Sequence, residues 1–207
     1  MNKQVFKKKK KRLSKPFLYV LFFILINIIL VGCEKRKSIE EEVRLLKSSP
    51  IALCLDSMVY CVDNDIKIPE SDSLSYYKDS VLGLVIFTDS SFCSPCAVKD
   101  MYKWYEIMDS TKNICAGQCK IFFIFSSPTS SVENIKYGLH EISFDSPVFI
   151  DTCGVFIRNN PHIPSNPLLH IFMIDKKHNV IMEGSPLRSE ERRNAFYQKI
   201  TKITKEK

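Results

Sequence analysis

The chain has 207 residues, of which 45% are hydrophobic, and a formal net charge of +7. The segment 1–32 contains eight basic residues and no acidic one, so subtracting eight charges from +7 leaves −1 for the segment 33–207. The excess of positive charge therefore gives no support for nucleic-acid binding. The segment 33–207 is long enough for one domain with a sizeable core.

The N-terminal segment has the pattern of an export signal. A basic stretch that ends at Lys15 is followed by an almost wholly apolar run over residues 17–31, broken only by Asn27. A stable membrane span usually needs about 20 apolar residues, and this run is shorter. We expect residues 1–32 to be a cleaved signal peptide, with an uncleaved N-terminal membrane anchor as the alternative. Both interpretations place the rest of the chain outside the cytoplasm.

The apolar run ends in Leu30-Val31-Gly32-Cys33, which resembles the lipobox of bacterial lipoproteins. The resemblance implies that the chain is cut before Cys33 and that acyl chains on Cys33, such as palmitate, hold the protein at a membrane. We therefore expect a cell-envelope protein whose domain faces the periplasm or the exterior. Residues 33–48 would then be the lipidated cysteine and a charged tether.

Residues 49–207 are expected to form the domain, with residues 49–80 as an N-terminal extension. Residues 51–55 and 58–61 predict two short strands that form a hairpin around Asp56-Ser57. The polar, turn-rich segment 63–79 predicts a loop.

The core, residues 81–205, begins with a continuous apolar run over residues 81–87, which predicts a strand buried on both faces. Residues 88–92 form a loop, and Cys93 opens a helix whose apolar face recurs at spacings of three and four up to Met108. A second buried strand is expected over residues 121–125. Ser130 and Glu133 then have capping-box spacing at the start of a second amphipathic helix.

The C-terminal part of the core ends in a hairpin and a helix. A short strand is expected at 147–150 and a loop over 152–167. Residues 168–174 and 180–183 predict an antiparallel hairpin, and Ser189 caps a final helix. Strands that alternate with helices and close with a hairpin predict an α/β fold, a three-layer sandwich with a mixed central sheet flanked by helices.

The motif that carries chemistry is Cys93-Ser94-Pro95-Cys96, at the junction of the buried strand and its helix. A cysteine at a helix N-terminus faces unpaired N–H groups and the positive end of the helix dipole, which lower its pKa and favour the nucleophilic thiolate. We expect Cys93 to attack and the more shielded Cys96 to close the ring that releases a mixed disulfide. Pro95 in the first turn removes no intrahelical bond.

Together these features resemble the thioredoxin superfamily, over about residues 81–205, and more narrowly the membrane-anchored thioredoxin-like proteins of bacterial envelopes. The resemblance implies a cis proline that faces the disulfide. Pro167 matches its position better than Pro164. Such a proline leaves the backbone of Asn166 free to pair with a substrate strand. The substrate-contacting residues implied in this way are Phe92, Ser94, Pro95, Asn166 and Pro167.

This chain also departs from the family pattern. Phe92 stands where the family usually has Trp, and Ser94 where thioredoxin has Gly. No residue matches the buried acid that lies beneath the disulfide in thioredoxin. The direction of electron flow is therefore open, although anchored relatives favour a reducing role.

The remaining cysteines have several interpretations. Seven cysteines follow Cys33, so at least one is unpaired, and Cys153 is our candidate. Cys115 and Cys119 predict a local bridge or a second exchange pair, and we favour the bridge; four-thiolate zinc binding with Cys93 and Cys96 is disfavoured by the helix between the pairs. Cys54 and Cys61 are either bridged across the hairpin or buried as thiols. The four histidines show no ligand spacing, and we expect structural or solvated roles for each of them, His170 included.

The sequence thus predicts an anchored thiol–disulfide oxidoreductase that needs no metal or cofactor. Its partners would be cysteine-containing exported proteins and an upstream thiol electron donor. The alternative is a non-catalytic binding lipoprotein whose Cys93–Cys96 bond is structural, and a peroxidase-like thiol enzyme is a third possibility. The redox potential of the pair separates the first two.

Overall fold

The computed structural model describes residues 38–62, 65–67, 77, 80–90 and 94–205. The chain divides into two units, Met1–Glu41 and Glu42–Lys207, and the fold described below is that of the second. The predicted signal peptide and Cys33 lie outside the described residues. No helix in the described part of the chain is long and apolar enough to cross a membrane.

The N-terminal part of the second unit differs from the predicted hairpin. Residues 42–46 are helical, and Leu46 is fully buried. Residues 51–54 form no strand, because Cys54 adopts a left-handed conformation (φ 52°) and leads into the 3-10 helix η1 (Leu55–Ser57). Strand β1 (Val59–Val62) pairs instead with β2 (Asp65–Lys67), which lies in the segment predicted as loop.

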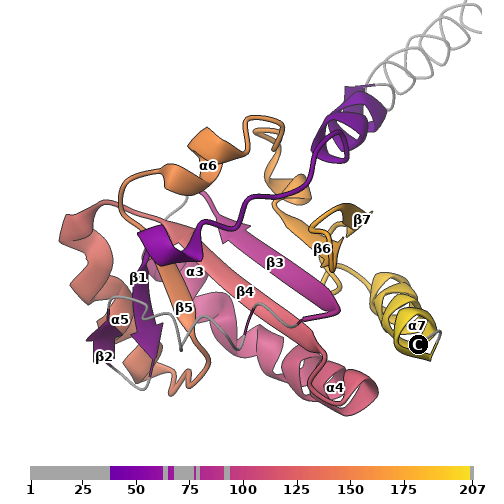
Figure 1. The fold of residues 1–207 in the computed structure, drawn as a ribbon. Helices are drawn as coiled ribbons and strands as arrows, with labels where there is room; N and C mark the ends of the chain where they lie inside the picture. Colours follow the sequence, from indigo (N-terminus) through magenta and orange to yellow (C-terminus); the bar gives the residue numbers. More distant parts are fainter. Residues whose placement is uncertain (1–37, 63–64, 68–76, 78–79, 91–93, 206–207) are drawn as a thin grey trace, which may run out of the picture. The chain divides into compact units, whose positions relative to one another are not determined.

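Within the described residues the central sheet has seven strands in the order β2-β1-β5-β4-β3-β6-β7 (Figure 1). The remaining strands are β3 (Leu82–Thr88), β4 (Cys119–Ser126), β5 (Val148–Asp151), β6 (Ile171–Asp175) and β7 (Val180–Glu183). Strands β3, β4 and β5 are parallel, whereas β6 and β7 run antiparallel and form the predicted hairpin. The sheet is therefore mixed, as predicted.

The helices lie along both faces of this sheet, and their order follows the chain. They are α3 (Ser94–Lys99), η2 (Asp100–Trp104), α4 (Tyr105–Cys115), η3 (Thr129–Ser131), α5 (Val132–Glu141), α6 (Val155–Asn159), η4 (Pro167–Leu169) and α7 (Glu190–Lys205). The predicted helix from Cys93 to Met108 is thus interrupted by the 3-10 turn η2. Ser189 accepts from Arg192 N–H at 3.2 Å and caps α7 as predicted, whereas no side chain caps α5, so the predicted capping box at Ser130 is wrong.

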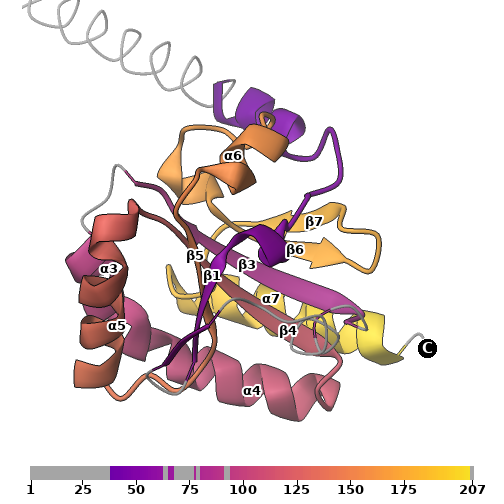
Figure 2. The same ribbon diagram turned by 60° about the vertical axis from the view of Figure 1, so that its left-hand side comes forward.

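Two hydrophobic clusters pack on opposite faces of the sheet. Strand β3 alternates between them: Leu84 and Ile86 face a cluster that includes residues of α3, α4, α5 and α7, and Val85 and Phe87 face one that includes α6 and the N-terminal segment (Figure 2). Because both faces are covered, β3 is buried from Leu82 to Phe87. The predicted three-layer α/β sandwich is confirmed, and β3 carries the site at its carboxyl end.

Candidate functional site

The carboxyl end of β3 and the start of α3 hold the predicted motif. Cys93 and Phe92 lie outside the described residues. Ser94 and Pro95 are the first two residues of α3, a position that tolerates proline because its N–H has no intrahelical partner. Cys96 is the third residue of the helix and is exposed. A thiol is therefore accessible in the first turn of a helix, where the dipole favours its ionised form.

A pocket of about 360 Å³ opens beside Cys96. Its walls include Thr88 at the end of β3, Asp100 of η2, and two residues from the segment before β6, Pro167 and His170. The structure thus brings together Cys96 and Pro167, which the sequence predicted as partners although they lie far apart in the chain. It also adds His170, for which the sequence predicted only a structural or solvated role.

Pro167 does not have the predicted geometry. The described residues contain no cis peptide bond, and Pro167 opens the 3-10 helix η4, so that β6 begins at Ile171 rather than at Leu168. The reason is local, because Asn-Pro is also a helix-start sequence, with Asn as the cap and Pro in the first turn. The Asn166 Oδ1 atom accepts from the Leu168 N–H at 3.1 Å and so caps this turn.

The backbone of Asn166 is consequently engaged within the chain. Its carbonyl accepts the Leu169 N–H at 3.0 Å, and its side-chain amide donates to Glu42 Oε2 at 2.7 Å. The prediction that Asn166 offers its carbonyl to a substrate strand is therefore wrong. In this region the carbonyl of His170 instead accepts the Phe87 N–H at 2.9 Å and extends the pairing of β6 with β3.

His170 is the buried polar side chain of this pocket. It is 4% exposed, and its ring lies 5.1 Å from the ring of Phe87, measured between centroids. Its Nε2 atom lies 2.9 Å from the Pro164 carbonyl oxygen. The sequence did not reveal this placement, because the faces of the strand around it could not be assigned before its pairing with β3 was known.

Asp100 supplies the negative charge of the pocket wall. Its carboxylate binds Lys103 Nζ at 2.6 Å on the exposed side of η2. This hydrogen bond to Asp100 raises the pKa of Lys103 above its usual value. The carboxylate thus already has a cationic partner.

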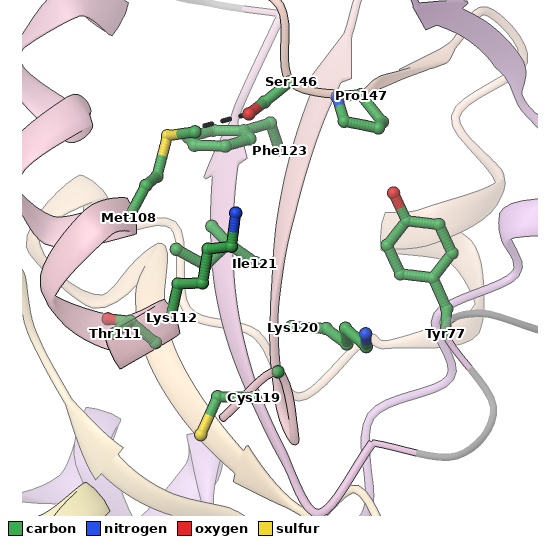
Figure 3. Close-up of a pocket in the computed structure, with 11 residues that line it drawn as sticks. Tyr77, Met108, Thr111, Lys112, Cys119, Lys120, Ile121, Phe123, Ser146 and Pro147 are labelled. Carbon is green, nitrogen blue, oxygen red and sulfur yellow. Dashed lines mark hydrogen bonds between the residues drawn. The ribbon is translucent and has the colours of Figure 1, made fainter. Parts of the chain in front are cut away.

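A second pair of cysteines lies at the other end of α4. Cys115 ends the helix, is 2% exposed, and donates to the Thr111 carbonyl at 2.7 Å. Cys119 begins β4 and lines a pocket of about 240 Å³ beside Thr111 and Lys112 (Figure 3). The two are thiols joined by a side-chain hydrogen bond, so the bridge favoured from the sequence is not present.

The other cysteines are spread over the fold. Cys61 belongs to the cluster on one face of the sheet and Cys54 packs against the cluster on the other, so the predicted alternative of a bridge between them is wrong. Cys153 is exposed beside α6. Among the described residues, no three or more His, Cys, Asp or Glu side chains converge as a metal site.

Comparison with solved structures finds thioredoxin-like proteins. The thioredoxin domain of a thiol-disulfide oxidoreductase from Bacteroides vulgatus is 14% identical, with a TM-score of 0.49 over 73% of this chain and 98% of that domain. A thioredoxin-like protein from Porphyromonas gingivalis is 12% identical, with a TM-score of 0.47 over 76% of this chain and 95% of that one. No family model matches the sequence, and no curated protein matches it at a significant level.

These identities and TM-scores are low, so the fold is assigned on the strand order of this chain itself. A parallel strand–helix–strand unit at the centre of the sheet is followed by an antiparallel hairpin and a last helix, and the cysteine motif joins the first strand to its helix. This is the arrangement that the sequence resemblance implied. The chain has a thioredoxin-like fold.

Proposed function

We propose that this protein is a thiol–disulfide oxidoreductase of the cell envelope that exchanges disulfides with cysteine-containing exported proteins through Cys93 and Cys96. The observation that carries the proposal is the position of Cys96, exposed in the first turn of α3 and beside a pocket at the end of a buried strand. An inert structural cysteine has no need of solvent access or of a helix N-terminus.

The proposed reaction is a two-electron exchange. The Cys93 thiolate attacks one sulfur of a substrate disulfide, the substrate S–S bond breaks, and a mixed disulfide forms. Cys96 then attacks Cys93, which releases the reduced substrate and leaves a Cys93–Cys96 disulfide. An upstream thiol donor returns two electrons to the pair, and the reducing direction is the one we propose for the cell.

The walls of the pocket suggest how a substrate is held. Phe87, Pro167 and Ile171 contribute apolar surface around Cys96. Such a surface suits an unfolded or extended segment that exposes a disulfide, since apolar contacts are non-directional and tolerate many sequences. Because the carbonyl of Asn166 is engaged by Leu169, we do not assign substrate pairing to it.

The compartment is part of the proposal. The basic leader, the apolar run and Cys33 support export followed by lipidation, which would hold the domain where disulfides are made and broken. Metabolic labelling with a palmitate analogue tests this placement. Label should enter the wild-type protein and not a Cys33→Ala variant, and equal labelling of both proteins would contradict it.

Insulin reduction by the purified protein tests the activity. We expect Cys93→Ser to abolish turnover, because the attacking thiolate is lost. The matched control is Cys153→Ser, which removes an exposed cysteine away from the pocket and should leave turnover unchanged. Unchanged activity in Cys93→Ser would refute the proposed role.

A further inference from the structure

His170 combines burial with an incomplete set of hydrogen bonds. Its Nε2 atom lies 2.9 Å from the Pro164 carbonyl oxygen, and a carbonyl oxygen can only accept, so Nε2 carries the proton. In the neutral imidazole the lone pair then lies on Nδ1. This atom is buried and has no hydrogen-bond partner among the described residues. A buried acceptor without a partner is costly unless it has a use.

The surroundings of His170 fix its ring without satisfying Nδ1. Phe87 packs against the ring at 5.1 Å between centroids, and the Pro164 carbonyl holds the opposite nitrogen. Strand β3 contributes only apolar buried residues from Leu82 to Phe87, so it places no carboxylate beneath the motif. The described titratable groups that line the pocket with His170 are Cys96 and Asp100, and Asp100 is bound to Lys103.

We propose that Nδ1 of His170 is the base that takes the proton of the Cys96 thiol. The assignment rests on the proposed function, because it concerns the second step of the exchange. Cys96 is the thiol of the pocket, and a cavity of about 360 Å³ has room for a bridging water between thiol and imidazole.

Protons and electrons balance in this step. Nδ1 accepts the Cys96 proton, and the resulting thiolate attacks the Cys93 sulfur of the mixed disulfide. A Cys93–Cys96 bond forms while the bond from Cys93 to the substrate sulfur breaks. The substrate sulfur leaves with the electron pair and takes the proton from His170, so the substrate is reduced by two electrons and the cysteine pair is oxidised.

The test separates the two steps in one trace. The reduced full-length protein, in a Cys153→Ser background, is mixed with one equivalent of Ellman's disulfide, and release of the coloured thiol is followed. The first release reports attack by Cys93, and the second reports attack by Cys96. His170→Gln keeps an amide N–H that can reach the Pro164 carbonyl but removes the base. His162→Gln is the control, because His162 is also a buried histidine with an unpartnered nitrogen but does not line this pocket.

At pH 7 we expect His170→Gln to slow the second release at least about tenfold, consistent with loss of a general base, and to leave the first unchanged. The difference should shrink as the pH rises past about 8.5, where a cysteine ionises without help. His162→Gln should behave as the wild type in both steps. A second release that is unchanged, or slowed equally at every pH, would overturn the assignment.

A measurement on the wild type guards against a variant that fails to fold. Nitrogen-15 NMR of the imidazole should show a proton on Nε2 and none on Nδ1 of His170 in the oxidised protein at neutral pH. A proton on Nδ1 would overturn the assignment. A wild type that shows no second release would instead contradict the proposed function itself, and the assignment with it.

Discussion

The two described cysteine sites near α3 and α4 occupy opposite helix ends, and their chemistry differs accordingly. Cys96 lies exposed in the first turn of α3, where the positive end of the helix dipole favours a thiolate. Cys115 is the last residue of α4, buried and bonded to the Thr111 carbonyl, where the dipole disfavours negative charge. Similar spacing of cysteines therefore does not imply similar reactivity.

The protonation of the second pair follows from its contacts. Cys119 forms a hydrogen bond to Cys115 and is partly buried, and both effects raise the pKa of Cys119 above the usual cysteine range. The same hydrogen bond lowers the pKa of Cys115. At neutral pH the pair therefore keeps a proton between its two sulfurs. We assign exchange to Cys93 and Cys96, and packing to Cys115 and Cys119.

The largest expected effect is loss of turnover in Cys96→Ser. Without the second thiol the mixed disulfide on Cys93 is not released, so insulin reduction should fall at least about 100-fold and substrates should stay covalently attached. Gel mobility with and without reductant measures the trapped complexes. Cys119→Ser should trap none, and equal trapping by both variants would remove the distinction between the sites.

The rate of alkylation at each cysteine comes next. A raised pKa means that the Cys119 thiolate forms only at higher pH, so at pH 8 iodoacetamide should modify Cys119 at least about tenfold more slowly than the exposed Cys153. The gap should narrow as the pH rises. Peptide mass spectrometry measures each site, and a Cys119 that reacts as fast as Cys153 would contradict the proposed protonation.

A smaller effect is expected on stability. Cys115→Ala removes a buried sulfur and its bond to the Thr111 carbonyl, so the free energy of unfolding should fall by about 1–2 kcal/mol. Insulin reduction below the unfolding transition should be unchanged. Urea denaturation measures the first quantity, and a loss of turnover in the folded variant would show that Cys115 takes part in exchange.

The smallest effect concerns the turn that joins the second pair. Gly117 has φ +80°, and open space surrounds the position of an added Cβ, so Gly117→Ala strains the backbone without a clash. We expect a loss of about 1 kcal/mol in the free energy of unfolding. Thermal denaturation measures it. The same substitution at Gly138, where a Cβ would meet Val98 at 2.8 Å, offers a contrasting case of steric cost.

The elements predicted correctly from the sequence are those whose signals are local. The continuous apolar runs before the motif and at 121–125 predicted β3 and β4, and the turn between 174 and 180 predicted the β6–β7 hairpin. The strand at 51–55 failed because Cys54 turns into a left-handed conformation that its composition does not signal. Asn166-Pro167 is compatible with two structures, and the helix start prevailed over the extended edge.

The candidate site was predicted only in part, for a related reason. Cys96 and Pro167 were placed by motif and by resemblance, and they line one pocket. The role of His170 depends on two long-range facts, the pairing of its carbonyl with Phe87 and the bond of its Nε2 to Pro164, which fix the face and the tautomer. Neither is encoded in the spacing of histidines along the chain.

The redox potential of the Cys93–Cys96 pair tests the central claim most directly. The protein is equilibrated in glutathione buffers of graded potential, quenched by acid and alkylation, and the oxidised fraction of each cysteine is measured by mass spectrometry. We expect a single disulfide, Cys93–Cys96, with a midpoint between about −270 and −120 mV, the range of exchange enzymes. A midpoint below about −300 mV, or a disulfide that equilibrates only at Cys115 and Cys119, would contradict the account.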